Sequence, residues 1–223
     1  HSDRTLGFYS GPFMASADEV SVTVTGRGGH GASPHLAIDP VVVCASIVMS
    51  LQTIVARNVD PFEAAVITVG ALQAGSASNV IPAQGRMSIT VRAFTAKTRS
   101  LLENRIRALV HAQAESFGAQ AKVEWVQGYP VLVNHEHETS LAREVALSWL
   151  GEDAIMADLR PVAASEDFAF MLERCPGSYI SIGNGEGSHP LHHPRYDFND
   201  AALPLGASYW VKLVERFLPA TGT

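Results

Sequence analysis

The sequence predicts an α/β chain, of the α+β type, whose first half is a ferredoxin-like βαββαβ domain. Between Glu19 and Gln127 the apolar residues first recur at every second position, as in a strand with one buried face. They then recur at every third or fourth position, as in an amphipathic helix. The two periods follow the order strand, helix, strand, strand, helix, strand. That order is the split βαβ unit, in which two helices cover one face of an antiparallel sheet.

The first strand and the first helix have the clearest signals. Val20, Val22 and Val24 alternate with serine and threonine, which predicts a half-buried strand. Asp39-Pro40 predicts a helix start, because Asp caps the first turn and proline is favoured at the first helical position. The apolar stripe of this helix consists of Cys44, Ile47, Val48, Leu51, Ile54 and Val55.

Two more strands, a second helix and a last strand complete the domain. Residues 65–72 are almost continuously apolar and residues 87–91 alternate, so both segments are predicted to be strands. The helix after them is predicted to stop at Gly118, a residue type common at C-terminal caps, and residues 123–125 mark the last strand. The buried face of this helix is predicted to consist of Leu102, Ile106, Leu109, Val110 and Phe117.

The second half, after the break at residues 128–130, has a looser periodicity. Residues 141–149 and 210–217 are predicted to be helices, and residues 178–182 a short strand. Ser165 is predicted to cap a short helix, with the two acidic residues that follow it in the first turn. So few strands cannot cover the apolar faces of these helices, so this half is expected to be part of a larger domain.

Composition and charge exclude several classes of partner. The chain has 223 residues, of which 47% are hydrophobic and 17% charged, as in ordinary globular proteins. Its formal charge of −6 and the lack of a basic face argue against nucleic acid. No uninterrupted apolar run approaches the ~18 residues of a membrane span, so no membrane association is expected. Cys44 and Cys175 lie far apart, so no disulfide framework is expected, and we predict a cytoplasmic location.

Two histidine-containing segments are candidate functional sites. His189, His192 and His193 lie in a segment with two prolines, which predicts an ordered loop. Imidazole is the commonest metal-binding side chain, and the alternative is a solvated polar loop. His30 is surrounded by four glycines, which leave its ring uncrowded; the alternative there is a turn with an incidental histidine.

Five segments, taken in order, resemble the M20 metallopeptidases. The resemblance is to the amidohydrolase branch, which contains N-acyl-amino-acid deacylases, hippurate hydrolases and auxin-conjugate hydrolases. It covers the chain from about Gly11 to its C-terminus. The segments are GPFMASADE from Gly11, GRGGHGASPH from Gly26, GSASNVIP from Gly75, SEDF from Ser165 and PLHHPRYDFND from Pro190.

This resemblance implies a protomer of two domains. One is a catalytic domain of the zinc-peptidase type that binds two zinc (or manganese or cobalt) ions, and the other is an inserted ferredoxin-like lid domain through which subunits form a homodimer. Residues 18–128 would be the lid and residues 129–223 the later part of the catalytic domain, with 1–17 a remnant of that domain or a stub. The implied activity is hydrolysis of the amide bond of N-acyl amino acids, or of small peptide-like amides, by metal-activated water.

The resemblance also implies roles for single residues. His192 matches a metal-ligand histidine, whereas His193 falls where the family often has Asn or Ser. His30 matches a lid histidine that reaches the partner subunit's active site and stabilises the oxyanion. Asn79 and Arg92 match lid residues that hold the carboxylate end or the carbonyl of the substrate. From the residues alone, Asn79 also fits a turn and Arg92 a solvent-facing strand position.

The chain departs from the family pattern in its metal ligands. The resemblance implies an upstream Cys/His pair, two adjacent glutamates and a further histidine, but the chain has no Glu-Glu pair and His1 lies too close to Gly11. One ligand, His192, cannot hold a dinuclear site. The leading prediction is therefore an incomplete portion of the enzyme, inactive by itself. The alternatives are a non-catalytic dimerisation or ligand-binding module of the same family, or a complete small enzyme that uses its histidines differently.

Overall fold

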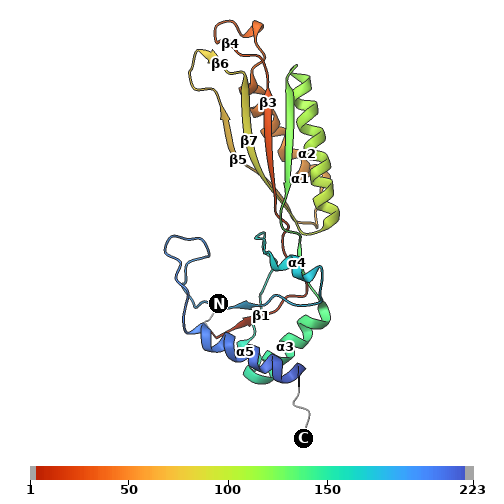
Figure 1. Cartoon of the computed structure of the whole chain (residues 1–223), viewed down its shortest axis with the longest axis vertical. Coiled ribbons are helices and arrows are strands. Elements are labelled where there is room, and N and C mark those ends of the chain that lie inside the picture. Colours follow the sequence, from red (N-terminus) through yellow and green to blue (C-terminus); the bar gives the residue numbers. More distant parts are fainter. Residues whose placement is uncertain (1–3, 219–223) are drawn as a thin grey trace. The chain divides into compact units, whose positions relative to one another are not determined.

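A computed structural model describes residues 4–218, which form a mixed α/β fold of two compact units (Figure 1). The sheet unit consists of Met14–Leu132 together with Val162–Asp167. The helical unit consists of residues 4–13, of Val133–Pro161 and of residues 168–218. His1 lies outside the described residues.

The sheet unit is a four-stranded antiparallel sheet with two helices on one face (Figure 1). The order across the sheet is β5-β7-β3-β8, which is the predicted βαββαβ arrangement. The helices are α1 (Pro40–Asn58) and α2 (Ala96–Ser116). The strands are β3 (Asp18–Thr25), β5 (Ala65–Ala74), β7 (Gln84–Ala93) and β8 (Gln120–Gln127).

The core of the sheet unit lies between the sheet and the two helices. Val22 in β3 is paired with Met87 and Val123, so the inward residues of three strands form one apolar layer. Ile47 and Leu51 of α1 are fully buried against this layer, as the helical spacing predicts. Burial of such side chains contributes about 1.5–3 kcal/mol each, which makes this layer the main source of the unit's stability.

The helix ends follow the predicted chemistry, with one exception. The Asp39 carboxylate accepts the N–H of Val41 at 2.8 Å, and proline follows at the first helical position. Gly118 has φ +76°, the left-handed conformation expected after a helix. The prediction that Phe117 is buried was wrong: α2 ends at Ser116, and Phe117 is 42% exposed in the turn that follows.

Within residues 4–218, α1 is the one helix long and apolar enough by length and composition to cross a membrane. Its buried residues pack in the core of the sheet unit. Core helices pass the same test of length and composition, and the packing of α1 explains the apolar residues of its buried face.

The helical unit is built around α3 (Glu136–Leu150) and α5 (Ala202–Phe217), with a short helix α4 (Phe168–Leu172). Tyr209 of α5 is buried, and its hydroxyl donates to the carbonyl of Ala142 at 3.0 Å. Burial raises the pKa of Tyr209 to about 12. The short strands of the helical unit were not predicted from the sequence, apart from β10, which covers two residues of the strand expected at 178–182. They are β1 (Leu6–Gly7), which pairs with β10 (Ser181–Ile182), and β2 (Gly11–Met14), which pairs with β9 (Leu132–Asn134).

Candidate functional site

His30 and Asn79 are brought together by a small ribbon at one end of the sheet (Figure 1). The ribbon pairs β4 (Gly29–His30) with β6 (Val80–Ile81), and His30 lies opposite Val80. The N–H of Gly31 donates to the carbonyl of Asn79 at 2.8 Å. The two predicted site residues are therefore neighbours, although they belong to segments far apart in the sequence.

Gly31 favours this close approach. A Cβ atom at position 31 would lie 3.1 Å from the carbonyl oxygen of Asn79 and 3.2 Å from its Cα, closer than most real contacts. A side chain at this position would require the Asn79 backbone to shift by a few tenths of an ångström. The sequence predicted that the glycines around His30 leave its ring uncrowded. The structure shows that they also permit the pairing of β4 with β6.

The His30 ring has one nitrogen engaged and one available. Its Nδ1 accepts the N–H of Ala32 at 3.0 Å, and its backbone carbonyl accepts the N–H of Ser33 at 2.8 Å. The side chain is exposed. The Nε2 atom is therefore the one that a ligand can reach.

Arg92 lies at the opposite end of the sheet from this ribbon. β6 leads directly into Gln84 at the start of β7, whereas Arg92 is next to its last residue. Arg92 is eight positions after Gln84 in the strand, which is about 26 Å at ~3.3 Å per residue. The three sheet-unit residues predicted for one substrate therefore do not form one site within the unit.

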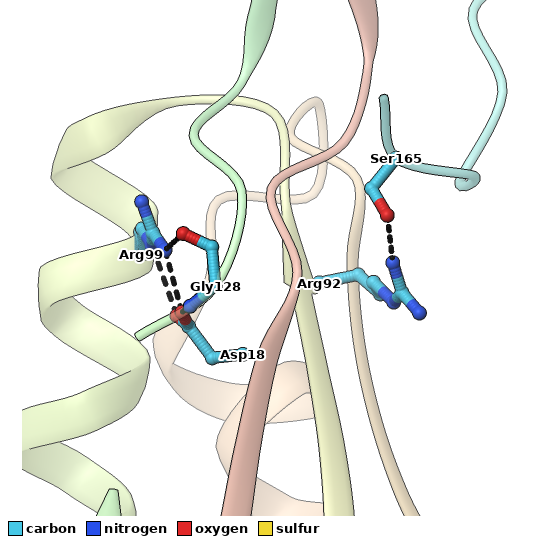
Figure 2. A network of polar contacts seen from close by, with 5 residues as sticks. All are labelled: Asp18, Arg92, Arg99, Gly128 and Ser165. Atoms are coloured by element: carbon cyan, nitrogen blue, oxygen red, sulfur yellow. Dashed lines mark hydrogen bonds and ion pairs between the residues drawn. The ribbon is translucent and has the colours of Figure 1, made fainter. Parts of the chain in front are cut away.

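Arg92 has a partner that sequence reasoning missed as a site residue. Its Nη1 donates to the Ser165 hydroxyl at 2.9 Å, and both side chains are half-buried (Figure 2). The prediction that Ser165 caps a helix was wrong, because α4 begins only at Phe168. Ser165 instead follows a segment in which Val162 and Ala164 accept the N–H of Ala15. The SEDF segment could have indicated a role for Ser165 in the site, because Ser165 is its first residue.

A buried ion pair lies at the same end of the sheet (Figure 2). Arg99 of α2 donates to both carboxylate oxygens of Asp18, at 2.9 and 2.5 Å. Asp18 is 1% exposed and Arg99 14%. Asp18 also accepts the N–H of Gly128, whose carbonyl accepts from Arg99. The pair therefore holds the start of β3, the end of β8 and the first turns of α2 together. Sequence reasoning did not identify it.

The histidine loop of the helical unit separates its three rings into two groups. The N–H of His193 donates to the carbonyl of Pro190 at 3.1 Å, which closes a turn with His192 at its third position. His192 is exposed and has φ 67°, a conformation uncommon for residues other than glycine and often found at functional sites. His189 and His193 instead stack on each other, with ring centroids 4.2 Å apart.

The described residues do not form a complete metal site. Within residues 4–218 no three His, Cys, Asp or Glu side chains converge to hold a metal ion. Zinc requires about four donors per ion, of which the protein commonly supplies three or more. His192 can therefore serve at most as one donor among others from outside this set.

The chain is similar to known hydrolases along almost its whole length. The model of peptidase family M20/M25/M40 matches residues 3–216. Hippurate hydrolase of Campylobacter jejuni is 38% identical over 217 residues, which are 97% of this chain and 56% of that protein. N-acetyl-L-cysteine deacetylase of Bacillus subtilis is 37% identical over 207 residues, or 93% of this chain and 49% of that protein.

A solved structure gives the same result. The YxeP protein of Bacillus subtilis, described as a dinuclear metal-binding peptidase of the M20 family, superposes with a TM-score of 0.79 and 28% identity. The match covers 97% of this chain and 54% of that one. The chain thus spans about half the length of the relatives it matches. Because the family model matches residues 3–216, the chain belongs to peptidase family M20/M25/M40.

Proposed function

We propose that the full-length protein that carries this chain is a metal-dependent amidohydrolase that cleaves N-acyl amino acids. The proposal rests on the placement of polar side chains in the sheet unit. His30 and Asn79 lie at one end of the sheet, and Arg92 lies at the other end with Ser165. Relatives named hippurate hydrolase and N-acetyl-L-cysteine deacetylase support this substrate class. In this proposal the sheet unit is the lid, and the helical unit is part of the catalytic domain.

The chemistry of Arg92 fits the carboxylate end of such a substrate. A guanidinium donates two parallel hydrogen bonds to a carboxylate, and these charge-assisted bonds are stronger than neutral ones. Ser165 holds Nη1 at 2.9 Å and so limits the rotation of the guanidinium. The hydroxyl of Ser165 can also donate to the substrate carboxylate, because it accepts from Arg92.

Arg92→Ala in the full-length protein is expected to raise KM for an N-acyl amino acid by about 10- to 100-fold, because hydrogen bonds to charged groups contribute ~1.5–3 kcal/mol. Arg92→Lys keeps the charge but loses the planar guanidinium that binds a carboxylate with two hydrogen bonds, so its affinity should lie between those of the wild type and Arg92→Ala. Steady-state kinetics with the matching amino-acid amide are the control. That substrate has no carboxylate, so an equal KM change for both substrates would contradict the assignment.

The distance between the two groups favours a homodimer. The strand from Gln84, which follows the ribbon that holds His30 and Asn79, to Arg92 is about 26 Å long, so one substrate cannot contact all three residues within one sheet unit. A site that contains all three needs two chains, one supplying Arg92 and the other His30 with Asn79. We propose that each active site is shared in this way.

The α1 side of the sheet unit is the proposed dimer surface. α1 has no charged residue between Asp39 and Arg57, and Met49 on its outer face is 72% exposed. α1 packs against β5, whose outer edge is unpaired within the described residues. An unpaired edge readily pairs with a strand of another chain. The other edge strand, β8, carries the exposed Lys122–Glu124 pair, which is less suited to burial.

Met49→Glu is expected to weaken self-association of the 223-residue chain by about 30- to 150-fold in Kd. A charge buried at the interface costs about 2–3 kcal/mol. Sedimentation equilibrium measures the change, and Asn104→Glu on the exposed face of α2 is the matched control. Equal behaviour of the two variants, or a chain that is monomeric at every concentration, would exclude this surface.

The metal would be held mainly by residues outside the described set. We propose that His192 supplies one donor, because its side chain is exposed and its backbone has a left-handed conformation within a closed turn. When bound, the ions would supply Lewis-acid chemistry to the amide carbonyl and to water. The residues of this chain bind the substrate and orient it.

The 223-residue chain alone is expected to bind zinc weakly and to show no turnover of hippurate, whereas the full-length protein should hydrolyse it and lose activity on chelation. His192→Ala in the full-length protein should lower the metal content. Metal analysis after dialysis and an amidohydrolase assay test both points. The second candidate function is a non-catalytic dimerisation or ligand-binding module. The observation that favours it is the incomplete metal site of the described residues. A full-length protein without chelator-sensitive hydrolysis would support this second candidate.

A further inference from the structure

We infer that the backbone N–H of Ala32 fixes the tautomer of His30, so that the ring acts as a neutral hydrogen-bond donor through Nε2. The Ala32 N–H positions the His30 ring, and the catalytic consequence of this positioning rests on the proposed function. The structural part of the inference concerns the imidazole alone and is testable without substrate.

The turn after β4 is closed twice by the same residue. The carbonyl of His30 accepts the N–H of Ser33 at 2.8 Å, which closes the backbone turn. The Nδ1 of His30 accepts the N–H of Ala32 at 3.0 Å. A side-chain acceptor that binds the N–H two residues ahead is the geometry of an Asx turn, here made by an imidazole. The ring is therefore held by its own loop.

This bond determines where the proton lies. A neutral imidazole has one protonated nitrogen, the donor, and one unprotonated nitrogen, the acceptor. Since Nδ1 accepts from Ala32, the proton of the neutral ring is on Nε2. The ring then has no free acceptor nitrogen, so it is suited neither to remove a proton from water nor to bind a metal through Nε2. It is suited to donate to an oxygen on which negative charge develops.

The ribbon places this donor on a rigid base. β4 pairs with β6, and Gly31 donates to the carbonyl of Asn79 at 2.8 Å, so the residues on both sides of the His30 ring are held by backbone hydrogen bonds. A donor that is already oriented requires no rearrangement when charge develops on the substrate. Ala32 thus acts through His30 and does not itself contact substrate.

The direct test is nitrogen NMR of the 223-residue chain at alkaline pH, with His30 assigned by comparison with His30→Ala. We expect an unprotonated Nδ1, a protonated Nε2 and a scalar coupling across the hydrogen bond between the Ala32 amide nitrogen and Nδ1. Ala32→Pro removes the N–H and should abolish the coupling and move the two ring shifts toward each other. Ala32→Gly keeps the N–H and should leave both unchanged. A protonated Nδ1, or shifts that Ala32→Pro does not alter, would overturn the inference.

Kinetics of the full-length protein test the catalytic consequence. Ala32→Pro is expected to lower kcat by about 10- to 100-fold with little change in KM, because a misoriented group loses transition-state stabilisation. In a His30→Gln background the same change should have less than about twofold effect, since an amide donor does not depend on a ring tautomer. Equal losses in both backgrounds would mean that Ala32 has only a structural role. If the full-length protein hydrolyses no amide, the proposed function fails, while the NMR result still decides the tautomer.

Discussion

His30→Ala in the full-length protein is expected to lower kcat by about 10²- to 10³-fold and to leave the metal content unchanged. The size of the loss is that of removing one preorganised oxyanion donor. The ring lies on an exposed ribbon in the sheet unit, and His192 lies in the helical unit. Steady-state kinetics and metal analysis on the same sample separate the two roles.

His35→Ala is the matched control, because His35 is exposed in the same loop. It is expected to leave kcat unchanged. If each site is shared between subunits, a heterodimer of His30→Ala and His192→Ala protomers should regain part of the activity, because one of its two sites is then whole. A verified heterodimer without any recovery would mean that His30 serves its own subunit or none.

Asp18→Ala is expected to reduce the free energy of unfolding by about 3–5 kcal/mol, because it leaves Arg99 nearly buried without its partner. The carboxylate also accepts the N–H of Gly128, so the variant loses a bond to β8 as well as the ion pair. Urea or thermal unfolding followed by circular dichroism measures the change. The effect should be among the largest for a single polar residue of the sheet unit.

Glu124→Ala is the control, because the Lys122–Glu124 pair is 71% and 56% exposed. Exposed pairs contribute about 0–1 kcal/mol, so this variant should change stability little. A second variant that replaces both partners, Asp18→Ala with Arg99→Met, should recover part of the loss, since no unpaired charge remains. Similar losses for Asp18→Ala and Glu124→Ala would show that burial does not set the strength of the Asp18 pair.

The long elements of the sheet unit followed from the sequence because their signals are local. The alternation of Val20, Val22 and Val24 and the stripe of α1 report which face is buried, whatever the partner. The caps at Asp39 and Gly118 depend on one or two residues and are equally local. The error at Phe117 arose where the helix ends, because burial of the last turn depends on where the next segment runs.

The site residues needed contacts between distant segments. β4 and β6 are two residues long, too short to show a period, so their pairing and the approach of Asn79 to Gly31 could not be predicted. Ser165 has the residue type of a cap, and only the structure shows its hydroxyl bound to Arg92. The Asp18–Arg99 pair joins residues on β3 and α2 for which the sequence offers no spacing rule.

The sequence by itself determined the βαββαβ order, the buried faces of β3, α1 and β7, and the candidates His30, Asn79, Arg92 and His192, because periodicity, caps and motifs are properties of short segments. Only the tertiary structure decided that His30 and Asn79 lie together and that Arg92 lies at the far end of the sheet with Ser165. Those relations depend on strand pairing and on hydrogen bonds between segments far apart in the chain. The same is true of the one hydrogen-bonded nitrogen of His30, since a loop must fold before Ala32 can donate to it.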